Sequence, residues 1–171
     1  MLPKIAPNHV VRVKQLAREG FYDGLTFHRV LDGFMAQTGD PKGDGTGGSR
    51  LFNLNAEFSE EVHTKGTVSM ARASDPNSAN SQFFIVTGDS FPHLDGKYTV
   101  WGRVVSGIEY VDNIKKGDGS RNGLVDEPDK IIKMAIGADL MSVDENGEVK
   151  TGNGDVMEQL LQIQVIQEES L

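Results

Sequence analysis

The stretch FHRVLDGFMAQTGD, residues 27–40, consists of two apolar-rich runs joined by the turn-forming triplet LDG. Side chains alternate between the two faces of a strand, so Phe27 and Arg29 would point one way, and Met35 and Gln37 would share a face in the second run. A single arginine in a strand is most often a partner in a surface ion pair. Here it stands close to an amide and to large apolar side chains, which favours a functional role.

The segment SQFFIVT, residues 81–87, repeats this association, because Gln82 directly precedes Phe83 and Phe84. A guanidinium keeps its positive charge at any working pH. The two segments together place a permanently charged donor and two amides beside large apolar side chains, a combination that a surface ion pair does not readily explain.

The middle of the chain alternates short apolar runs with Gly, Asp, Asn and Pro, which is typical of a β-sandwich or a closed β-barrel. The runs are LTFHRV (25–30), GFMAQ (33–37), GTVSMA (66–71), SQFFIVT (81–87), KYTVWGRVV (97–105) and KIIKMAI (130–136). We expect a mainly β, antiparallel architecture.

Two segments have helical spacing of apolar residues. The first runs from Asn8, a predicted N-cap, to Gly20, a predicted stop, and the second from Ser106 to Gly117. The sequence therefore predicts two amphipathic helices beside the strands.

The net charge of −8 argues against nucleic acid and against membrane binding through basic residues. Cysteine is absent, which excludes disulfides and thiolate chemistry. No run reaches the roughly 18 apolar residues of a spanning helix, and the first twenty residues lack the apolar core of a signal peptide. We expect a cytoplasmic protein, or a periplasmic one if an N-terminal segment is missing.

Several other kinds of site are disfavoured. GDGTGG (43–48) matches a dinucleotide fingerprint, but no helical pattern follows it, so a loop is the better interpretation. The four histidines form no i, i+4 pair, and SVDENGEVKTGN (142–153) lacks the closing glutamate of a calcium loop. A Ser/His/Asp hydrolase has no G-x-S-x-G elbow to support it, although its residues need not be close in sequence. We expect no metal and no cofactor.

The segments FYDGLTFHRVLDGFMAQTGD, GTGGS, AEF, GTVSMARA, NSANSQFFIVT and LDGKYTVWGRVVSG closely resemble the cyclophilin family of peptidyl-prolyl cis-trans isomerases, of the bacterial type. The resemblance extends from about Ala6 to Leu140. It implies a closed, eight-stranded antiparallel β-barrel capped by two helices. It also implies binding of proline-containing peptides and of unfolded or folding proteins, in the manner of a folding chaperone.

The resemblance further implies roles for individual residues. Arg29 would be the catalytic arginine, Phe34 would act with it in the proline pocket, and Gln37 would hold the substrate backbone. The remaining pocket and groove residues would be Met35, Ala71, Arg72, Ala73, Gln82, Phe84 and Leu94. Where many cyclophilins have a tryptophan this chain has His93, and where they have a histidine it has Tyr98. His93 implies weak cyclosporin binding, because the family's tryptophan donates a hydrogen bond to that drug.

Rotation about an X-Pro bond breaks no bond to a heavy atom, so a chain without a nucleophile, metal or cofactor suits an isomerase. The predicted function is therefore a peptidyl-prolyl cis-trans isomerase that assists protein folding. The alternative is a proline-peptide binding module on the same fold with little turnover; a nucleotide-binding protein using GDGTGG is a third, much weaker candidate.

The two ends depart from the cyclophilin pattern. The family has most of two more strands before the segment matching residues 2–7, so we expect either a fragment or another segment in their place. The division is an isomerase domain at 1–140 and an extension at 141–171. Turn residues at 141–154 suggest a hairpin, whereas VMEQLLQIQVIQ (156–167) fits a capped helix or an alternating strand that pairs into the barrel.

Overall fold

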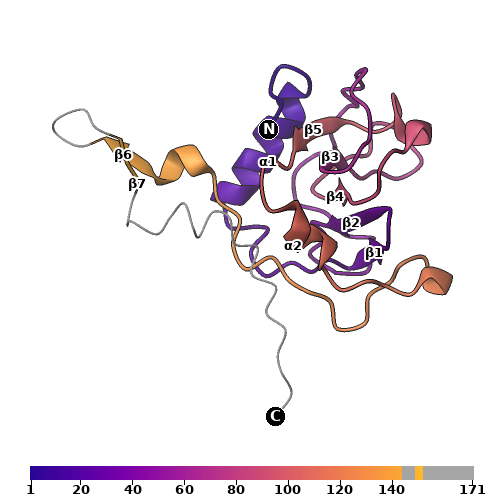
Figure 1. The fold of residues 1–171 in the computed structure, drawn as a ribbon. Coiled ribbons are helices and arrows are strands. Elements are labelled where there is room, and N and C mark those ends of the chain that lie inside the picture. Colours follow the sequence, from indigo (N-terminus) through magenta and orange to yellow (C-terminus); the bar gives the residue numbers. More distant parts are fainter. Residues whose placement is uncertain (144–148, 152–171) are drawn as a thin grey trace, which may run out of the picture.

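A computed structural model describes residues 1–143 and 149–151 of the chain. Its central feature is an antiparallel sheet of five strands in the order β1-β2-β4-β3-β5 (Figure 1). The strands are β1 (Arg29–Leu31), β2 (Met35–Thr38), β3 (Thr67–Met70), β4 (Phe83–Val86) and β5 (Val100–Arg103). Each coincides with a predicted apolar run, although β1 and β2 each extend one residue past the end of their runs, so the expectation of a mainly β, antiparallel fold is confirmed.

The strand register aligns three residues across the sheet. Arg29 on β1 is paired with Gln37 on β2, and Gln37 is paired with Phe84 on β4. Directly opposed residues lie on the same face of a sheet. The register therefore places a cation, an amide and an aromatic ring in one row.

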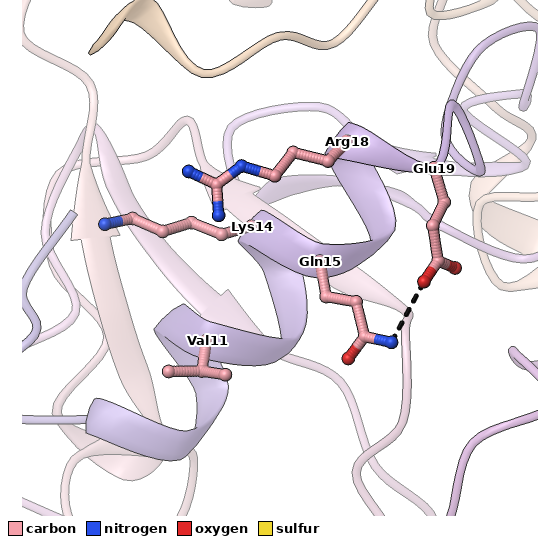
Figure 2. Close-up of a pocket in the computed structure, with 5 residues that line it drawn as sticks. All are labelled: Val11, Lys14, Gln15, Arg18 and Glu19. Carbon is pink, nitrogen blue, oxygen red and sulfur yellow. Dashed lines mark hydrogen bonds between the residues drawn. The ribbon is translucent and has the colours of Figure 1, made fainter. Parts of the chain in front are cut away.

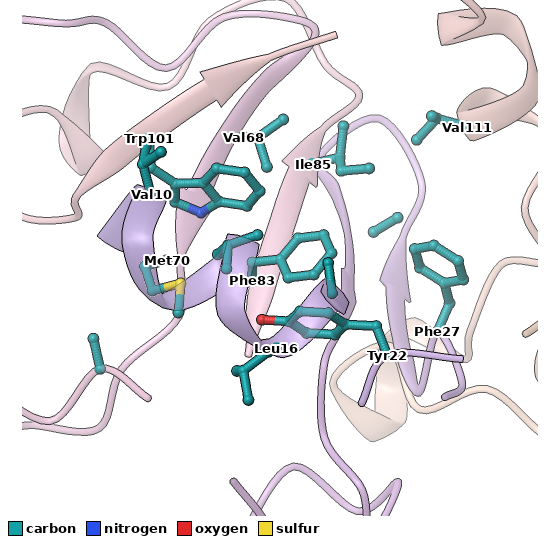
Figure 3. Close-up of a cluster of buried hydrophobic side chains, with 14 of the residues drawn as sticks. Val10, Leu16, Tyr22, Phe27, Val68, Met70, Phe83, Ile85, Trp101 and Val111 are labelled. Atoms are coloured by element: carbon teal, nitrogen blue, oxygen red, sulfur yellow. The ribbon is translucent and has the colours of Figure 1, made fainter. Parts of the chain in front are cut away.

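Helix α1 (Pro7–Arg18) packs against the sheet and closes the main core. Figure 3 shows Val10 and Leu16 of this helix beside Tyr22, Phe83 and Trp101. Phe83 makes edge-to-face contacts with both Tyr22 and Trp101, with centroid distances of 5.5 Å in each case. These packed rings hold β4 firmly in the core, because each aromatic side chain buries a large apolar area.

The two ends of α1 test the predicted helix boundaries. Proline suits the first helical position, so α1 starts at Pro7 with Ala6 as its N-cap, and the prediction of Asn8 as the cap is wrong. The Asn8 backbone and side chain donate to Glu57 instead. Gly20 has φ +68 directly after the C-cap, which confirms it as the stop.

Helix α2 (Ile108–Asp112) is much shorter than the predicted 106–117 segment. The chain leaves the helix at Asn113, and the N–H of Gly117 donates to the carbonyl of Val30 at 2.9 Å. A Cβ on Gly117 would collide with the Gly123 carbonyl. This glycine therefore permits a close backbone contact and does not cap a helix.

The predicted strand at 130–136 is wrong apart from one bridge, between Lys130 and Thr26. Ile131 exchanges backbone hydrogen bonds with Gly24 and Leu25, and beyond it the Asp23 carboxylate accepts the Met134 N–H. A side chain replaces the strand partner there, so the ladder cannot continue.

The face predicted for Phe27 is also wrong. Phe27 lies in the main core with Val30, because regular pairing begins only at Arg29. The shared face of Met35 and Gln37 follows from their places two residues apart in β2.

The described residues also contain three short 3-10 helices, η1 (Pro92–Leu94), η2 (Gly119–Arg121) and η3 (Gly137–Leu140). Strands β6 (Met141–Val143) and β7 (Val149–Thr151) pair antiparallel, which confirms the hairpin, and Figure 1 shows them beyond α1 and away from the main sheet. The helix-or-strand segment at 156–167 lies outside the described residues. Within them, the closed eight-stranded barrel is not seen and stays a prediction, and no helix is long and apolar enough to span a membrane.

Candidate active site

Arg29 is held on two sides by neutral groups. Its Nη1 donates to Oε1 of Gln37 at 3.1 Å, and its Nε and Nη2 donate to the carbonyl and side-chain oxygens of Asn122, both at 3.0 Å. Partial burial lowers the pKa of the guanidinium from its ordinary value, but an arginine starts so high that it remains charged. No carboxylate bonds to Arg29 among the described residues. Its charge is therefore oriented without being neutralised.

Gln37 connects this arginine to a second amide. Its Nε2 donates to Oε1 of Gln82 at 2.9 Å, while its own Oε1 accepts from Arg29. A primary amide has two N–H groups. One N–H of Gln37 consequently remains for another acceptor.

A second hydrophobic cluster adjoins these polar groups and is distinct from the main core. Its buried members are Met35, Phe84, Val86 and Leu94, and its partly exposed members are Leu31, Phe34, Ala71, Phe91 and Tyr98. Nη1 of Arg29 lies 3.9 Å from Sδ of Met35, so the guanidinium touches this cluster directly. The structure thus brings a permanent donor against a partly exposed apolar surface.

The rim of the cluster carries the other predicted residues. His93 lies near Phe34, with a centroid distance of 6.3 Å, and Tyr98 meets the edge of Phe84 at 5.8 Å. The guanidinium carbon of Arg72 is 4.6 Å from the centre of the Tyr98 ring, a cation–π arrangement. Ala71 belongs to the cluster, and Ala73 is exposed just beyond it.

A family model for cyclophilin type peptidyl-prolyl cis-trans isomerases matches residues 1–136. The chain belongs to this family. A probable peptidyl-prolyl cis-trans isomerase of Brucella abortus is 56% identical over 148 residues, covering 80% of this chain and 75% of the relative. Peptidyl-prolyl cis-trans isomerase B of Bacillus subtilis is 46% identical, covering 69% of this chain and 82% of its own.

Solved structures agree with the sequence relatives. Cyclophilin AquaCyp293 from Hirschia baltica superposes with a TM-score of 0.71 at 29% identity, covering 83% of this chain and 70% of its own. A Cryptosporidium parvum cyclophilin, solved in the presence of the dipeptide Ala-Pro, gives a TM-score of 0.65 at 32% identity, with 73% and 82% covered. The predicted isomerase function is confirmed, and the comparisons do not favour the alternative of a binding module.

The second hydrophobic cluster packs against a Ser-His-Asp arrangement in which the serine and histidine are buried and the aspartate is partly exposed. His63 bonds through Nδ1 to Oδ1 of Asp95 at 2.8 Å and through Nε2 to Oγ of Ser69 at 3.0 Å. Ser69 is fully buried, however, and its hydroxyl also donates to the Thr99 carbonyl. A hydrolytic serine must reach its substrate, so this triad supports the fold. The His63 ring stacks on Phe84, with 6.1 Å between centroids.

The GDGTGG loop (43–48) forms no phosphate cradle, because bends and coil, not a helix, follow it. The buried Asp40 carboxylate already accepts two of the loop's backbone N–H groups, those of Asp44 and Gly45, together with that of Lys42 just before the loop. In the described part of the chain, no three His, Cys, Asp or Glu side chains could hold a metal ion.

A hollow on the outer face of α1 is lined by side chains of that helix and the residue after it, Val11, Lys14, Gln15, Arg18 and Glu19 (Figure 2). Gln15 donates to Glu19 there at 2.9 Å. None of the predicted site residues lines it, so it plays no part in the isomerase site.

Sequence reasoning missed two groups of this site, Asn122 and His63. Asn122 contacts Arg29 from 93 residues away, and His63 is hidden beneath Phe84. The quoted motifs include neither residue, and only the folded chain brings them to the site.

Proposed function

We propose that Arg29 is the catalytic residue and that it donates a hydrogen bond to the prolyl nitrogen of a twisted X-Pro bond. The amide must lose its resonance over a barrier of about 18–20 kcal/mol. The nitrogen then gains a lone pair that the planar ground state lacks. A donor that meets this lone pair binds the transition state more tightly than the substrate, which is the condition for catalysis.

The observation that supports this assignment is the contact of an unneutralised guanidinium with the apolar cluster. Nη1 lies 3.9 Å from Met35, a buried member of the cluster. An apolar surface of this kind suits a proline ring, with Phe34, Phe84 and Leu94 as further contacts.

A single preorganised donor can supply a large part of the barrier reduction that an isomerase needs. An acceleration of about 10⁵-fold corresponds to about 7 kcal/mol, and one preorganised donor contributes about 3–4 kcal/mol. The rest would come from holding the ring in the cluster while the free N–H of Gln37 fixes the substrate backbone.

We assign proline-containing peptides and unfolded or folding proteins as substrates. The similar Cryptosporidium parvum cyclophilin was solved in the presence of Ala-Pro, which supports a proline dipeptide as the minimal ligand. The groove for residues before the proline would be formed by Ala71, Arg72, Ala73 and Gln82.

Arg29→Ala tests the assignment. Loss of the donor should lower kcat/KM for a proline peptide at least about 100-fold, with a melting temperature close to that of the wild type. Arg29→Lys should also lose most activity, because an ammonium lacks the planar fork that Asn122 and Gln37 bind. Arg18→Ala, which removes an exposed arginine bound to Asp139, is the matched control. Full isomerisation by the Arg29→Ala variant would refute the role.

We also propose that cyclosporin binds weakly, since His93 replaces the ring that donates to the drug in many cyclophilins. His93→Trp should tighten binding about tenfold, the value of one added hydrogen bond. Calorimetric titration of both proteins measures the difference. Equal affinities would show that His93 does not set the affinity.

We propose in addition that the sheet belongs to a closed eight-stranded barrel and that residues 1–140 form the isomerase domain, with 141–171 as an extension. The fold similarity to cyclophilins supports closure, and the backbone of β5 already accepts the N–H of Leu2 at Trp101. Slow amide exchange along both edges of β5 would support closure, and fast exchange on its outer edge would refute it.

The proposed domain boundary is tested by truncation, since a chain ending at Leu140 should retain turnover. A cytoplasmic location is likewise proposed, and cell fractionation tests it.

A further inference from the structure

A continuous chain of hydrogen bonds connects the glycine-rich loop to the catalytic guanidinium. Nε2 of Gln82 donates to the carbonyls of Gly45 and Gly47 at 3.0 and 2.8 Å. Oε1 of Gln82 accepts from Gln37, and Oε1 of Gln37 accepts from Arg29. Gln82 therefore joins three neighbouring segments of the chain, β1, β2 and the glycine-rich loop, in one relay.

The direction of this relay is fixed at both ends. Backbone carbonyls can only accept, and a guanidinium can only donate. Gln82 must therefore turn its NH₂ toward the loop, Gln37 must turn its NH₂ toward Gln82, and Gln37 must present oxygen to Arg29. A flip of either amide would set donor against donor or acceptor against acceptor.

Asn122 holds the opposite edge of the guanidinium. It ends η2 with φ +57, in the left-handed region that asparagine tolerates. Its turn is tied to β1, because the N–H of Val30 donates to the carbonyl of Gly123 at 2.8 Å. Both oxygens of Asn122 thus reach Arg29 from a fixed backbone.

We propose that Gln82 and Asn122 are positioning residues that aim Arg29 at the substrate, an inference that rests on the proposed role of Arg29. A guanidinium has five N–H groups. Three of them bond to oxygen, one to Gln37 and two to Asn122, and Nη1 also makes a weak bond to the sulfur of Met35. The second N–H of Nη2 has no bond to the described residues, and the three bonds to oxygen fix where both terminal nitrogens point. The glycine-rich loop then has a function, since its carbonyls set the orientation of the Gln82 amide.

Asn122→Gly gives the cleanest test, because glycine accepts the same φ and keeps the backbone carbonyl. Loss of Oδ1 alone should lower kcat about fivefold, as expected for one hydrogen bond, and leave KM within about twofold. Asn122→Asp keeps an oxygen at that place but adds a negative charge that would pair with the guanidinium, so it should not restore kcat. Glu127→Gly is the matched control, since Glu127 also has positive φ, at +52, and does not bond to Arg29. Unchanged kcat in Asn122→Gly would overturn the role of Asn122.

Gln82→Leu separates positioning from substrate contact. If Gln82 orients Gln37, kcat falls with little change in KM; a rise in KM alone would show that Gln82 only lines the groove and would overturn its place in the relay.

A second measurement does not depend on activity. Rotation of the Arg29 Nη groups, followed by ¹⁵N NMR and assigned with Arg29→Lys, should be slow in the wild type and faster in Asn122→Gly and Gln82→Leu. Equal rotation rates in all three proteins would overturn the proposal. Slow wild-type rotation in a protein that fails to isomerise proline peptides would instead uphold the relay and refute the proposed function.

Discussion

At the scale of single residues, the site depends on the neutrality of the groups that hold Arg29. Three of its hydrogen bonds end on amide oxygens, two of side chains and one of the backbone, and a weak fourth ends on the sulfur of Met35. Such bonds orient a guanidinium and leave its positive charge intact. A carboxylate in the same place would form a stronger, charge-assisted pair.

Gln37→Glu is therefore expected to damage catalysis while it preserves the fold. The new carboxylate would draw the guanidinium toward itself and could no longer donate to Gln82. We expect kcat to fall at least about tenfold, equivalent to about 1.4 kcal/mol of transition-state stabilisation. Gln15→Glu makes the same chemical change on the exposed side of α1, and steady-state kinetics of both variants gives the comparison. Undiminished kcat in Gln37→Glu would show that neutral partners are not required.

The sequence predicts part of this residue-level picture. Arg29, Gln37 and Phe84 come together as the resemblance implies. They occupy paired positions on three neighbouring strands, β1, β2 and β4. Asn122 could not be predicted, since its contact requires a turn that returns to β1 with the left-handed φ that the folded chain imposes. The catalytic roles themselves stay predictions until Arg29→Ala and Gln37→Glu are measured.

At the scale of elements, the junction between β2 and β4 links the fold to the site. Gly39 follows β2 with φ +86, and a Cβ there would collide with the Ser81 carbonyl and come within 2.9 Å of the Cα of Gln82. The backbone of β4 thus approaches β2 closely just before the amide that the relay uses.

Gly39→Ala should accordingly lower both stability and activity. Displacement of the Ser81–Gln82 backbone resembles overpacking of a core, which costs about 1–3 kcal/mol. Gly24→Ala is the control, because Gly24 also has positive φ, at +79, but open space around its Cα; it should cost only about 1–2 kcal/mol of backbone strain. Chemical denaturation and the isomerisation assay measure the two effects. Normal kcat/KM in Gly39→Ala would mean that the junction does not position Gln82.

Sequence patterns located the elements better than they located the element ends. Each of the five strands of the sheet overlaps an apolar run, but the strands are shorter than the runs, and β1 and β2 each extend one residue past the end of their run. Hydrogen-bond partners decide where a strand ends. In the run 130–136, for example, the Asp23 carboxylate accepts the N–H of Met134, so no neighbouring strand can pair there. In the same way, the close approach of Gly117 to Gly123, and not helix propensity, keeps α2 short of its predicted end.

At the scale of the whole molecule, two buried histidines make the free energy of unfolding depend on pH. His9, on the buried face of α1, is fully buried and bonds to Glu57 at 2.6 Å, and His28, which directly precedes β1, is 3% exposed. Burial lowers the pKa of both imidazoles; the Glu57 hydrogen bond opposes it in His9, and the Asp40 charge opposes it in His28. Composition showed four histidines, but only tertiary packing reveals that these two are buried.

The sign of the effect on stability follows from these directions. In the unfolded chain both imidazoles regain a pKa of about 6.5, above their values in the folded protein. Below that pH the unfolded state binds more protons than the folded state, so the free energy of unfolding falls as pH falls. Each histidine contributes at most about 1.4 kcal/mol per pH unit. Their stabilisation is complete above pH 6.5 and is lost as the pH falls toward the folded-state pKa values.

We therefore expect the melting temperature to fall steadily between about pH 7 and pH 5.5, in the range where histidines titrate. His28→Leu removes one of the two titrating groups and keeps an apolar side chain in the site it occupied, so the decline should become shallower. Scanning calorimetry at several pH values, with both proteins in the same buffers, measures the two slopes. Because the hydrophobic core is indifferent to pH, identical slopes would mean that burial of His28 does not disfavour its protonation, and that acid sensitivity arises elsewhere in the chain.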